Sequence, residues 1–426
     1  MAPADEERQP DAVQSLLLAL GVALTMTGDA VSEIQRILRN AARAYGHPDA
    51  AISVLPTLLV VGLSEGRAAA MRTIDSIRQL RLDQSSQVIA VARECERAEL
   101  DPGDAEQQLR TIVASPPRFG TPAYIAAHAV ATLGLGLVIR PAPVDLWAYL
   151  GLGLLVGAMK AYGRRFGSTG YLLPVVAAAI VSAVAFLAHG DSEAASLRLT
   201  IPPLVTFLPG ALITMATVDL AMGEIVTGAS RFLAGMLQLA LLGIGIVVGA
   251  EIVGNPANGP VAGPSADTLG AWAPWLGVVL FGAGIFVHDS GPRKALPWLL
   301  VVLFTSYAGG LLGERVINAT LSGFFGAAVM VPVAHAVAHI RTAPPAHVMF
   351  LPAFWLLVPG TLGLIGVAEL VGNNTENGLA NLASALAAIP AIALGILVGT
   401  MIVRVTRLIL ATPGVKGLGP VRTFQR

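Results

Sequence analysis

Two acidic residues lie at the ends of long apolar stretches of this chain and could exchange protons. Asp219 ends the stretch that begins at Ile201, and Glu369 ends the stretch that begins at Leu351. Because a low dielectric penalises a charged carboxylate, the proton occupancy of each acid could change with its access to water. We favour this proton-coupling hypothesis. The alternative is a solvated acid at the end of each helix.

Each stretch also contains a Pro-Gly pair, Pro209-Gly210 in the first and Pro359-Gly360 in the second. Proline removes a backbone hydrogen bond and glycine permits a bend, so each helix is predicted to break in mid-span. A break frees carbonyl oxygens and the positive end of a half-helix, which suit the ammonium and carboxylate groups of an amino acid. The alternative is an ordinary kink that both stretches inherited.

Polar side chains around the first break are further candidates for substrate contact. Thr206, Thr214 and Thr217 could bond a substrate hydroxyl, although threonines in membrane helices often bond the carbonyl four residues earlier. Glu224 and Arg231 follow, and we expect them to pair at the cytoplasmic mouth. The predicted transport residues are therefore Pro209, Gly210, Thr206, Thr214, Thr217, Asp219, Glu224, Arg231, Pro359, Gly360 and Glu369.

The remaining chemistry-bearing residues predict neither a metal site nor an enzyme. His335 and His339 have the spacing of two ligands on one helix face, but no third ligand accompanies them. For His128 and the His288-Asp289 pair, a structural role is favoured over a proton relay. The sequence contains no phosphate-binding loop and no nucleophile elbow, so we predict no catalytic residue and no cofactor. Transport must then use an ion gradient or facilitated diffusion.

The positions named above recur at a constant offset of 150 residues, which indicates an internal duplication. The matching positions are Pro209-Gly210 with Pro359-Gly360, Asp219 with Glu369, Gly245 and Gly249 with Gly395 and Gly399, and Gly163 and Arg165 with Gly313 and Arg315. Each half is predicted to hold five helices. Because five is odd, the second half starts on the opposite membrane face, which gives the inverted repeat typical of secondary transporters.

The composition of the chain predicts that these residues lie on membrane-spanning helices. The 426-residue chain is 54% hydrophobic and only 13% charged, against roughly 25% charged in soluble proteins. Ten apolar segments are close to the length that crosses a bilayer, and their backbone must be satisfied internally, so they are predicted to be helices. They span residues 122–139, 146–162, 171–188, 203–221, 232–250, 271–287, 295–312, 319–338, 348–368 and 378–403.

The first 118 residues differ from the rest, because they hold 12 basic and 16 acidic residues. Helical periodicity is followed by a β-rich stretch at 52–61 that is predicted to form a hairpin with 68–74, and then by two more amphipathic helices. The predicted fold is an all-α polytopic membrane protein with ten transmembrane helices in a 5+5 inverted repeat, preceded by a small α+β cytosolic domain. Its expected parts are 1–118 (cytosolic domain), 119–254 (first repeat), 255–270 (linker), 271–404 (second repeat) and 405–426 (cytosolic tail).

Loop charge predicts the orientation. With residues 1–118 inside, the predicted cytoplasmic segments carry twelve Lys and Arg residues, against three outside at Arg140, Arg198 and Arg315. Both termini are therefore expected in the cytoplasm. The net charge is zero, which argues against nucleic-acid binding. Cys95, the single cysteine, is expected to be buried and cannot form an internal disulfide.

Two segments together resemble the bacterial threonine/serine exporter family. The first is the turn Thr27-Gly28-Asp29-Ala30 with the helix that follows it, and the second is the run from Leu204 to Arg231. The signature positions in that run are Pro209, Gly210, Asp219, Gly223, Glu224, Gly228 and Arg231. The chain lacks the arginine that this family often carries beside the acid, so the resemblance implies that Asp219 has lost its charge partner. The second half has Asn373-Asn374-Thr375 in place of Gly223-Glu224, which suggests a scaffold.

The resemblance implies export of L-threonine and L-serine through a bacterial inner membrane, driven by the proton motive force in the manner of an antiporter. Its partners would be these small molecules and the lipid bilayer, and association into a homo-oligomer is left open. Two alternatives remain at this stage. One is a membrane-anchored enzyme, and the other is a passive channel with a cytosolic regulatory domain.

Overall fold

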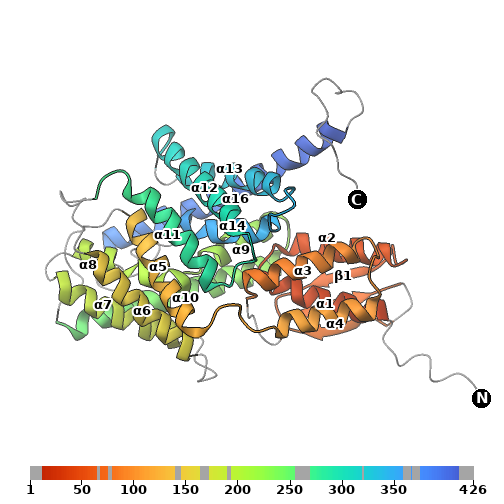
Figure 1. Ribbon diagram of the computed structural model, residues 1–426, viewed down its shortest axis with the longest axis horizontal. Helices are drawn as coiled ribbons and strands as arrows, with labels where there is room; N and C mark the ends of the chain where they lie inside the picture. Colours follow the sequence, from red (N-terminus) through yellow and green to blue (C-terminus); the bar gives the residue numbers. More distant parts are fainter. Residues whose placement is uncertain are drawn as a thin grey trace, which may run out of the picture.

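The computed structural model describes residues 12–64, 68–74, 79–139, 145–163, 172–189, 193–254, 269–318, 321–357, 366 and 375–411. A small α+β domain near the N-terminus lies beside a larger domain of helices (Figure 1). The predicted site residues Pro359, Gly360 and Glu369 lie outside the described residues, as does the centre of the second predicted break.

The N-terminal domain packs four helices with one antiparallel sheet of order β1-β2-β3. Its elements are α1 (Ala12–Thr25), α2 (Val31–Ala44), β1 (Ala51–Val54), β2 (Leu58–Gly62), β3 (Ala70–Thr73), α3 (Leu82–Cys95) and α4 (Pro102–Ala114). The predicted hairpin strand 52–61 is in fact two strands, because the chain reverses at residues 55–57. Leu55 N–H there donates to the carbonyl of Leu58, and Pro56 has no N–H to give to a ladder.

Helix α1 is mostly apolar and lies at the centre of this domain. Its leucines Leu16, Leu17, Leu20 and Leu24 have no exposed surface. A side chain at Gly21 would collide with Leu59 of β2, so glycine here permits the close approach of helix and sheet. Cys95 is buried in the same core, as predicted.

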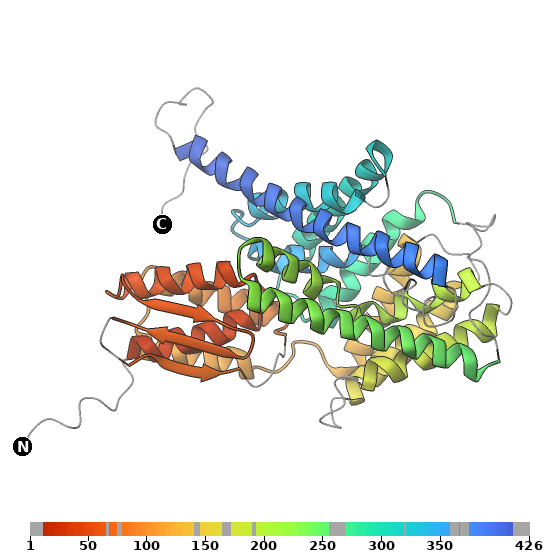
Figure 2. The ribbon, with the colours of Figure 1, turned by 180° about the vertical axis from the view of Figure 1, so that it is seen from behind.

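The larger domain is built from apolar helices at nearly all the predicted spans. Its elements are α5 (Thr121–Val138), α6 (Asp145–Gly163), α7 (Leu172–His189), α8 (Glu193–Thr200), η2 (Pro202–Phe207), α9 (Gly210–Ala221), α10 (Ile225–Ile252), α11 (Ala273–His288), α12 (Leu296–Val316), α13 (Ser322–Val337), α14 (Ala346–Leu357) and α16 (Thr375–Ala411). Five helices in the described part of the chain are long and apolar enough to cross a membrane: α5, α7, α10, α12 and residues 378–409 of α16. Figure 2 shows the two longest, α10 (green) and α16 (blue), running the length of this domain.

The predicted span 203–221 is interrupted. The 3₁₀-helix η2 ends at Phe207, Leu208 has extended backbone angles, and α9 begins at Gly210. The break therefore falls at the Pro209-Gly210 pair. The carbonyl oxygen of Phe207, on its N-terminal side, is not left bare, because Gln238 of α10 donates to it at 2.5 Å.

Small residues set the contact between paired helices in both halves of this domain. On α10, a side chain at Gly245 would meet the carbonyl of Val175 and the side chain of Ala178 on α7. On α16, a side chain at Gly395 would meet the carbonyl of Phe324 and the side chain of Ala327 on α13. Close backbone approach through glycine therefore occurs at corresponding places in the two helix pairs.

Candidate functional site

The turn between α1 and α2 reaches into the larger domain and begins the site. Gly28 has a φ of +84°, a conformation that favours glycine. The Thr27 hydroxyl donates to the Leu24 carbonyl at 2.7 Å and lies 3.1 Å from the Asp29 carboxylate, which fixes the direction of the acid. Ala30 packs into the apolar core of the other domain. The turn thus places Asp29 at the junction of the two domains.

Asp219, at the end of α9, receives this turn. Its Oδ1 accepts from the backbone N–H of Val31 at 2.8 Å, and its Oδ2 lies 2.6 Å from Nη1 of Arg231 on α10. The Asp219 side chain has no exposed surface. A carboxylate at the first N–H of α2 satisfies a donor that the helix cannot use and meets the positive end of its dipole. Arg231 also donates to the carbonyl of Asp29 at 3.1 Å, so one guanidinium bridges both domains.

The expected pairing of Arg231 with Glu224 is therefore wrong, and so is the loss of a charge partner for Asp219. The chain reverses through Gly223, which has a φ of +87°, and the first turns of α10 run back along α9. A side chain at Gly228 would meet Leu220 and the carbonyl of Ala216, so glycine allows the two helices to touch. Arg231, one turn further along α10, comes to lie beside Asp219.

His347, at the start of α14, is the fourth residue of this contact between the domains. We call the cluster of Asp29, Asp219, Arg231 and His347 the junction. Its Nδ1 lies 2.6 Å from Oδ1 of Asp29, and its Nε2 lies 2.9 Å from the carbonyl oxygen of Thr27. Since both ring nitrogens face acceptors, this geometry suits the doubly protonated, positively charged imidazole. Burial by itself raises the pKa of the Asp29 carboxyl, but the adjacent His347 charge and the hydrogen bonds from His347 and Thr27 together hold it below its usual value.

Beside this junction lies a cavity of about 1030 Å³ between the two domains. Its walls come from α2 and α3 of the N-terminal domain and from α9, α13, α14 and α16 of the larger domain. The volume is at the upper end of the range for ligand pockets, roughly 300–1,000 Å³. Charged lining residues of both signs are Asp29, Glu33, Arg36, Arg93, Glu96, Arg97, Arg404 and Arg407. Apolar lining residues of the larger domain include Met215, Val218, Val331, Phe350, Ile396 and Leu397.

The three predicted threonines do not gather at this cavity. Thr217 donates to the carbonyl of Ile213 at 3.1 Å, which is the helix-internal bond of the alternative interpretation. Thr206 accepts from Lys160 at 2.6 Å, away from Asp219. Thr214 is fully buried, and its hydroxyl has no partner among the described residues. Of the predicted transport residues, the structure brings together Asp219 and Arg231.

Two residues of the junction, Asp29 and His347, are not among the predicted transport residues. Asp29 stands in the turn that carries the family resemblance, so a signal for it was present. His347 has no such signal, because its partners are Thr27 and Asp29, more than 300 residues earlier in the chain. His335 and His339 each contact the carbonyl oxygen four residues earlier.

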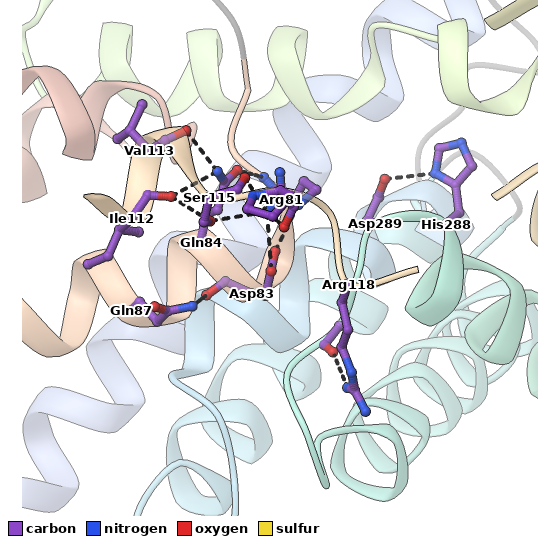
Figure 3. A network of polar contacts seen from close by, with 12 residues as sticks. Arg81, Asp83, Gln84, Gln87, Ile112, Val113, Ser115, Arg118, His288 and Asp289 are labelled. Atoms are coloured by element: carbon purple, nitrogen blue, oxygen red, sulfur yellow. Dashed lines mark hydrogen bonds and ion pairs between the residues drawn. The ribbon is translucent and has the colours of Figure 1, made fainter. Parts of the chain in front are cut away.

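A second set of polar contacts holds the N-terminal domain against the end of α11 (Figure 3). The Leu82 N–H donates to the Asp289 carbonyl at 3.0 Å, and Arg118 donates to the Gly291 carbonyl at 3.0 Å. Arg81 supports this side by an ion pair with Asp83 at 3.1 Å and by bonds to the backbone after α4. The domain is thus docked at two places, at the turn before α2 and at the start of α3.

A bundle of apolar helices, interrupted at Pro209-Gly210 and joined to an α+β domain across a charged cavity, defines a multi-pass membrane protein. Residues 15–253 match the model of a family described as "Putative threonine/serine exporter", and the chain belongs to this family. The matched segment contains Asp29, Asp219 and Arg231 but ends before His347. The family is one of membrane exporters, which confirms the prediction that the chain is not an enzyme.

Individual relatives extend the similarity. The threonine/serine exporter of Corynebacterium glutamicum is 22% identical over 439 aligned positions, which cover 95% of this chain and 85% of the relative. Pheromone-regulated membrane protein 10 of Candida albicans, from strains WO-1 and SC5314, is 25% identical over 305 positions. That alignment covers 66% of this chain and 26% of the fungal protein. No solved structure matches the chain significantly.

Proposed function

We propose that this chain exports L-threonine and L-serine across the bacterial inner membrane, driven by the proton motive force and working by alternating access. Family membership and the Corynebacterium relative, itself a threonine/serine exporter, support the substrate class. In this proposal the N-terminal domain and both termini are cytoplasmic, as the loop charges predict. The cavity between the domains is then the cytoplasmic entrance for substrate.

The proposal includes ten membrane spans arranged as an inverted repeat. The corresponding contacts of Gly245 with α7 and Gly395 with α13 support the duplication. The interruption at Pro209-Gly210 supplies the bend that alternating access needs, because α9 can tilt without carrying η2 with it. Pro359-Gly360 would serve the second half in the same way.

The chemistry of the cavity fits a zwitterion. An amino acid presents one carboxylate and one ammonium group. The lining offers guanidinium groups at Arg404 and Arg407, and carboxylates at Glu33 and Glu96 that already share the Arg36 guanidinium at 2.6 and 3.3 Å. Close charges of both signs favour such a ligand over an ion of one sign. The apolar lining residues of the cavity accommodate the short side chain of such an amino acid.

The single observation that carries the mechanism is the junction of Asp29, Asp219, Arg231 and His347. It ties the N-terminal domain to α9, the half-helix after the break, and to α14. Any tilt of α9 must therefore either break these bonds or move the N-terminal domain together with α9. The N-terminal domain acts as the inner gate, and its closed position requires the intact junction.

Uptake of labelled threonine into inside-out proteoliposomes tests the proposal. Such vesicles turn the cytoplasmic face outward, so export appears as accumulation, and an acidic lumen supplies the driving gradient. We expect accumulation with the gradient and only equilibration without it. Labelled alanine and leucine serve as competitors for specificity. Absence of threonine and serine flux in folded protein overturns the proposal.

A further inference from the structure

A buried histidine outside the junction has one nitrogen that nothing satisfies. His128 on α5 has no exposed surface, and its Nε2 lies 3.1 Å from the carbonyl oxygen of Pro203 in η2. Because a carbonyl only accepts, Nε2 carries the proton in that contact. The other nitrogen, Nδ1, has no hydrogen-bond partner among the described residues. A neutral His128 therefore holds a buried lone pair that can take up one proton.

Titratable groups face His128 from the helices packed around it. From α11, the ring of His288 lies 5.3 Å from the His128 ring, and its Nδ1 lies 2.7 Å from Asp289. From α5 itself, Tyr124 stacks on His288 at 4.3 Å. From α6, the Lys160 ammonium donates to Thr206 and lies 5.0 Å from the Phe207 ring centre. The fourth neighbour, η2, contributes no ionisable side chain.

These contacts converge on the segment just before the break at Pro209-Gly210. His128 holds η2 through the Pro203 carbonyl, and Lys160 holds it through Thr206. A proton on Nδ1 would make His128 a cation within electrostatic reach of the Lys160 ammonium. Two like charges in a low-dielectric interior repel strongly, so both cannot keep their contacts with η2.

We propose that His128 binds the proton that drives export, and that its protonation releases η2 and so lets α9 tilt. This inference rests on the proposed function and names its coupling site. The proton is taken up at Nδ1 from the outer side and given up on the cytoplasmic side. His288, whose ring lies 5.3 Å from that of His128, is paired with Asp289 (Figure 3), and the carbonyl of Asp289 accepts from Leu82 of the N-terminal domain. The Asp289 side chain is 29% exposed. His288 and Asp289 provide the exit route.

The matched test uses His128→Gln in the full chain, reconstituted as above. The glutamine amide can still donate to the Pro203 carbonyl but cannot take up a proton, so a merely structural histidine is replaced without loss. His128→Asn is a second neutral variant in case the first does not fold. His189→Gln is the control, since His189 pairs with Asp145 at 2.9 Å at the far end of α7. Gradient-driven accumulation is compared with counterflow, which exchanges labelled for unlabelled threonine without a gradient.

We expect a neutral residue at position 128 to abolish gradient-driven accumulation and its pH dependence while counterflow continues. Lys160→Met should shift the pH midpoint of accumulation to more alkaline values, because the repelling charge is gone. Accumulation that persists in either neutral variant overturns the inference. A wild-type exporter that ignores the pH gradient also overturns it but leaves the proposed substrate intact. Absence of wild-type flux and counterflow refutes the proposed function itself.

Discussion

At the residue scale, the ion pair of Asp219 and Arg231 stabilises the junction only while both charges are present. Removing one partner of a buried pair leaves an uncompensated charge, which costs about 3–5 kcal/mol. We predict that Asp219→Asn and Arg231→Gln each reduce threonine export in cells by about tenfold or more, which corresponds to about 1.4 kcal/mol or more of that cost.

The double variant separates the ion pair from other roles of these residues. An asparagine at position 219 can still accept from Val31, and a glutamine at position 231 can donate to that asparagine, so the two new side chains form a neutral, hydrogen-bonded pair. Coupled neighbours deviate from additivity by about 0.5–3 kcal/mol. The double variant should therefore export faster than Arg231→Gln alone. Strictly additive losses, at equal protein levels, would contradict the assignment.

The contact of Asp29 with His347 predicts how docking depends on pH. Docking lowers the Asp29 pKa, so the docked form holds fewer protons than the undocked form. The contribution of the Asp29 charge to the stability of docking is fully present above the ordinary aspartate pKa of about 3.9. This contribution is lost as the pH falls through the lower pKa that Asp29 has in the docked form. Protection against hydrogen exchange at the start of α2, taken relative to the intrinsic exchange rate at each pH, should therefore stay high down to about pH 4 and then fall.

Asp29→Asn should remove this acid-dependent step and speed exchange at neutral pH. Asp49→Asn is the control, because Asp49 is exposed near the end of α2 and far from the junction in the chain. The same exchange profile in both variants would show that Asp29 does not hold the domain.

Sequence could identify Asp219 and Arg231 but not their arrangement. An acid at the end of an apolar stretch is visible in composition, and both residues belong to a recognisable signature. The donor to Asp219 is Val31, which is 188 residues away, and no local spacing encodes that contact. In the structure the acid is paired and caps α2, which favours a role in docking, while its predicted role in proton coupling stays a prediction.

At the element scale, the antiparallel contact of α9 with α10 depends on Gly228. Its added methyl group would lie 2.9 Å from the Ala216 carbonyl oxygen and 2.7 Å from Leu220, and backbone atoms cannot move aside cheaply. Overpacking of this kind costs about 1–3 kcal/mol. We predict that Gly228→Ala separates the two helices, weakens the Arg231 contact and lowers export.

Gly151→Ala on α6 is the matched control, because nothing lies within 4 Å of the added methyl group. Both variants raise helix propensity equally, so a difference between them isolates the contact. Export and thermal unfolding in detergent are measured together. Equal behaviour of the two variants would show that α9 and α10 need not touch.

Helix positions followed from sequence because apolar length and turn residues are local properties. Several described helices of the larger domain start within a few residues of the predicted spans, for instance α5 at Thr121 and α12 at Leu296, whereas α10 starts at Ile225, seven residues before its predicted span. The second strand at Leu58 was missed because a β-rich run does not show where it reverses. Here the reversal is set by Pro56 and its neighbours, whose effect depends on pairing with the rest of the sheet.

At the scale of the whole molecule, the N-terminal domain is held at two separate places, so it can pivot about one while the other opens. The junction around Asp219 is tied to the moving half-helix α9. The contacts of Leu82 and Arg118 are tied to α11, which packs against α5. We infer that the α11 contacts are the hinge of the gate and that the Asp219 junction is its latch.

This division predicts different defects at the two places. Arg118→Ala removes the bond to the Gly291 carbonyl and the contact with the Phe119 ring, so the hinge loosens while the latch remains. We expect threonine counterflow to continue and gradient-driven accumulation to fall, because a gate that no longer closes fully leaks. Arg231→Gln should instead slow both modes, because it removes the bonds through which the N-terminal domain and α9 move together, so that the conformational cycle itself is impaired.

The control for the hinge is Arg110→Ala on α4, since Arg110 pairs with Glu106 on the exposed face of the same domain. An exposed pair of this kind contributes at most about 0.5 kcal/mol, so both transport modes should match wild type. The ratio of accumulation to counterflow is the measurement. If Arg118→Ala keeps the wild-type ratio, Arg118 is not part of the hinge. If it slows both modes equally, the contact serves folding and not gating, since a leaking gate lowers accumulation without slowing exchange.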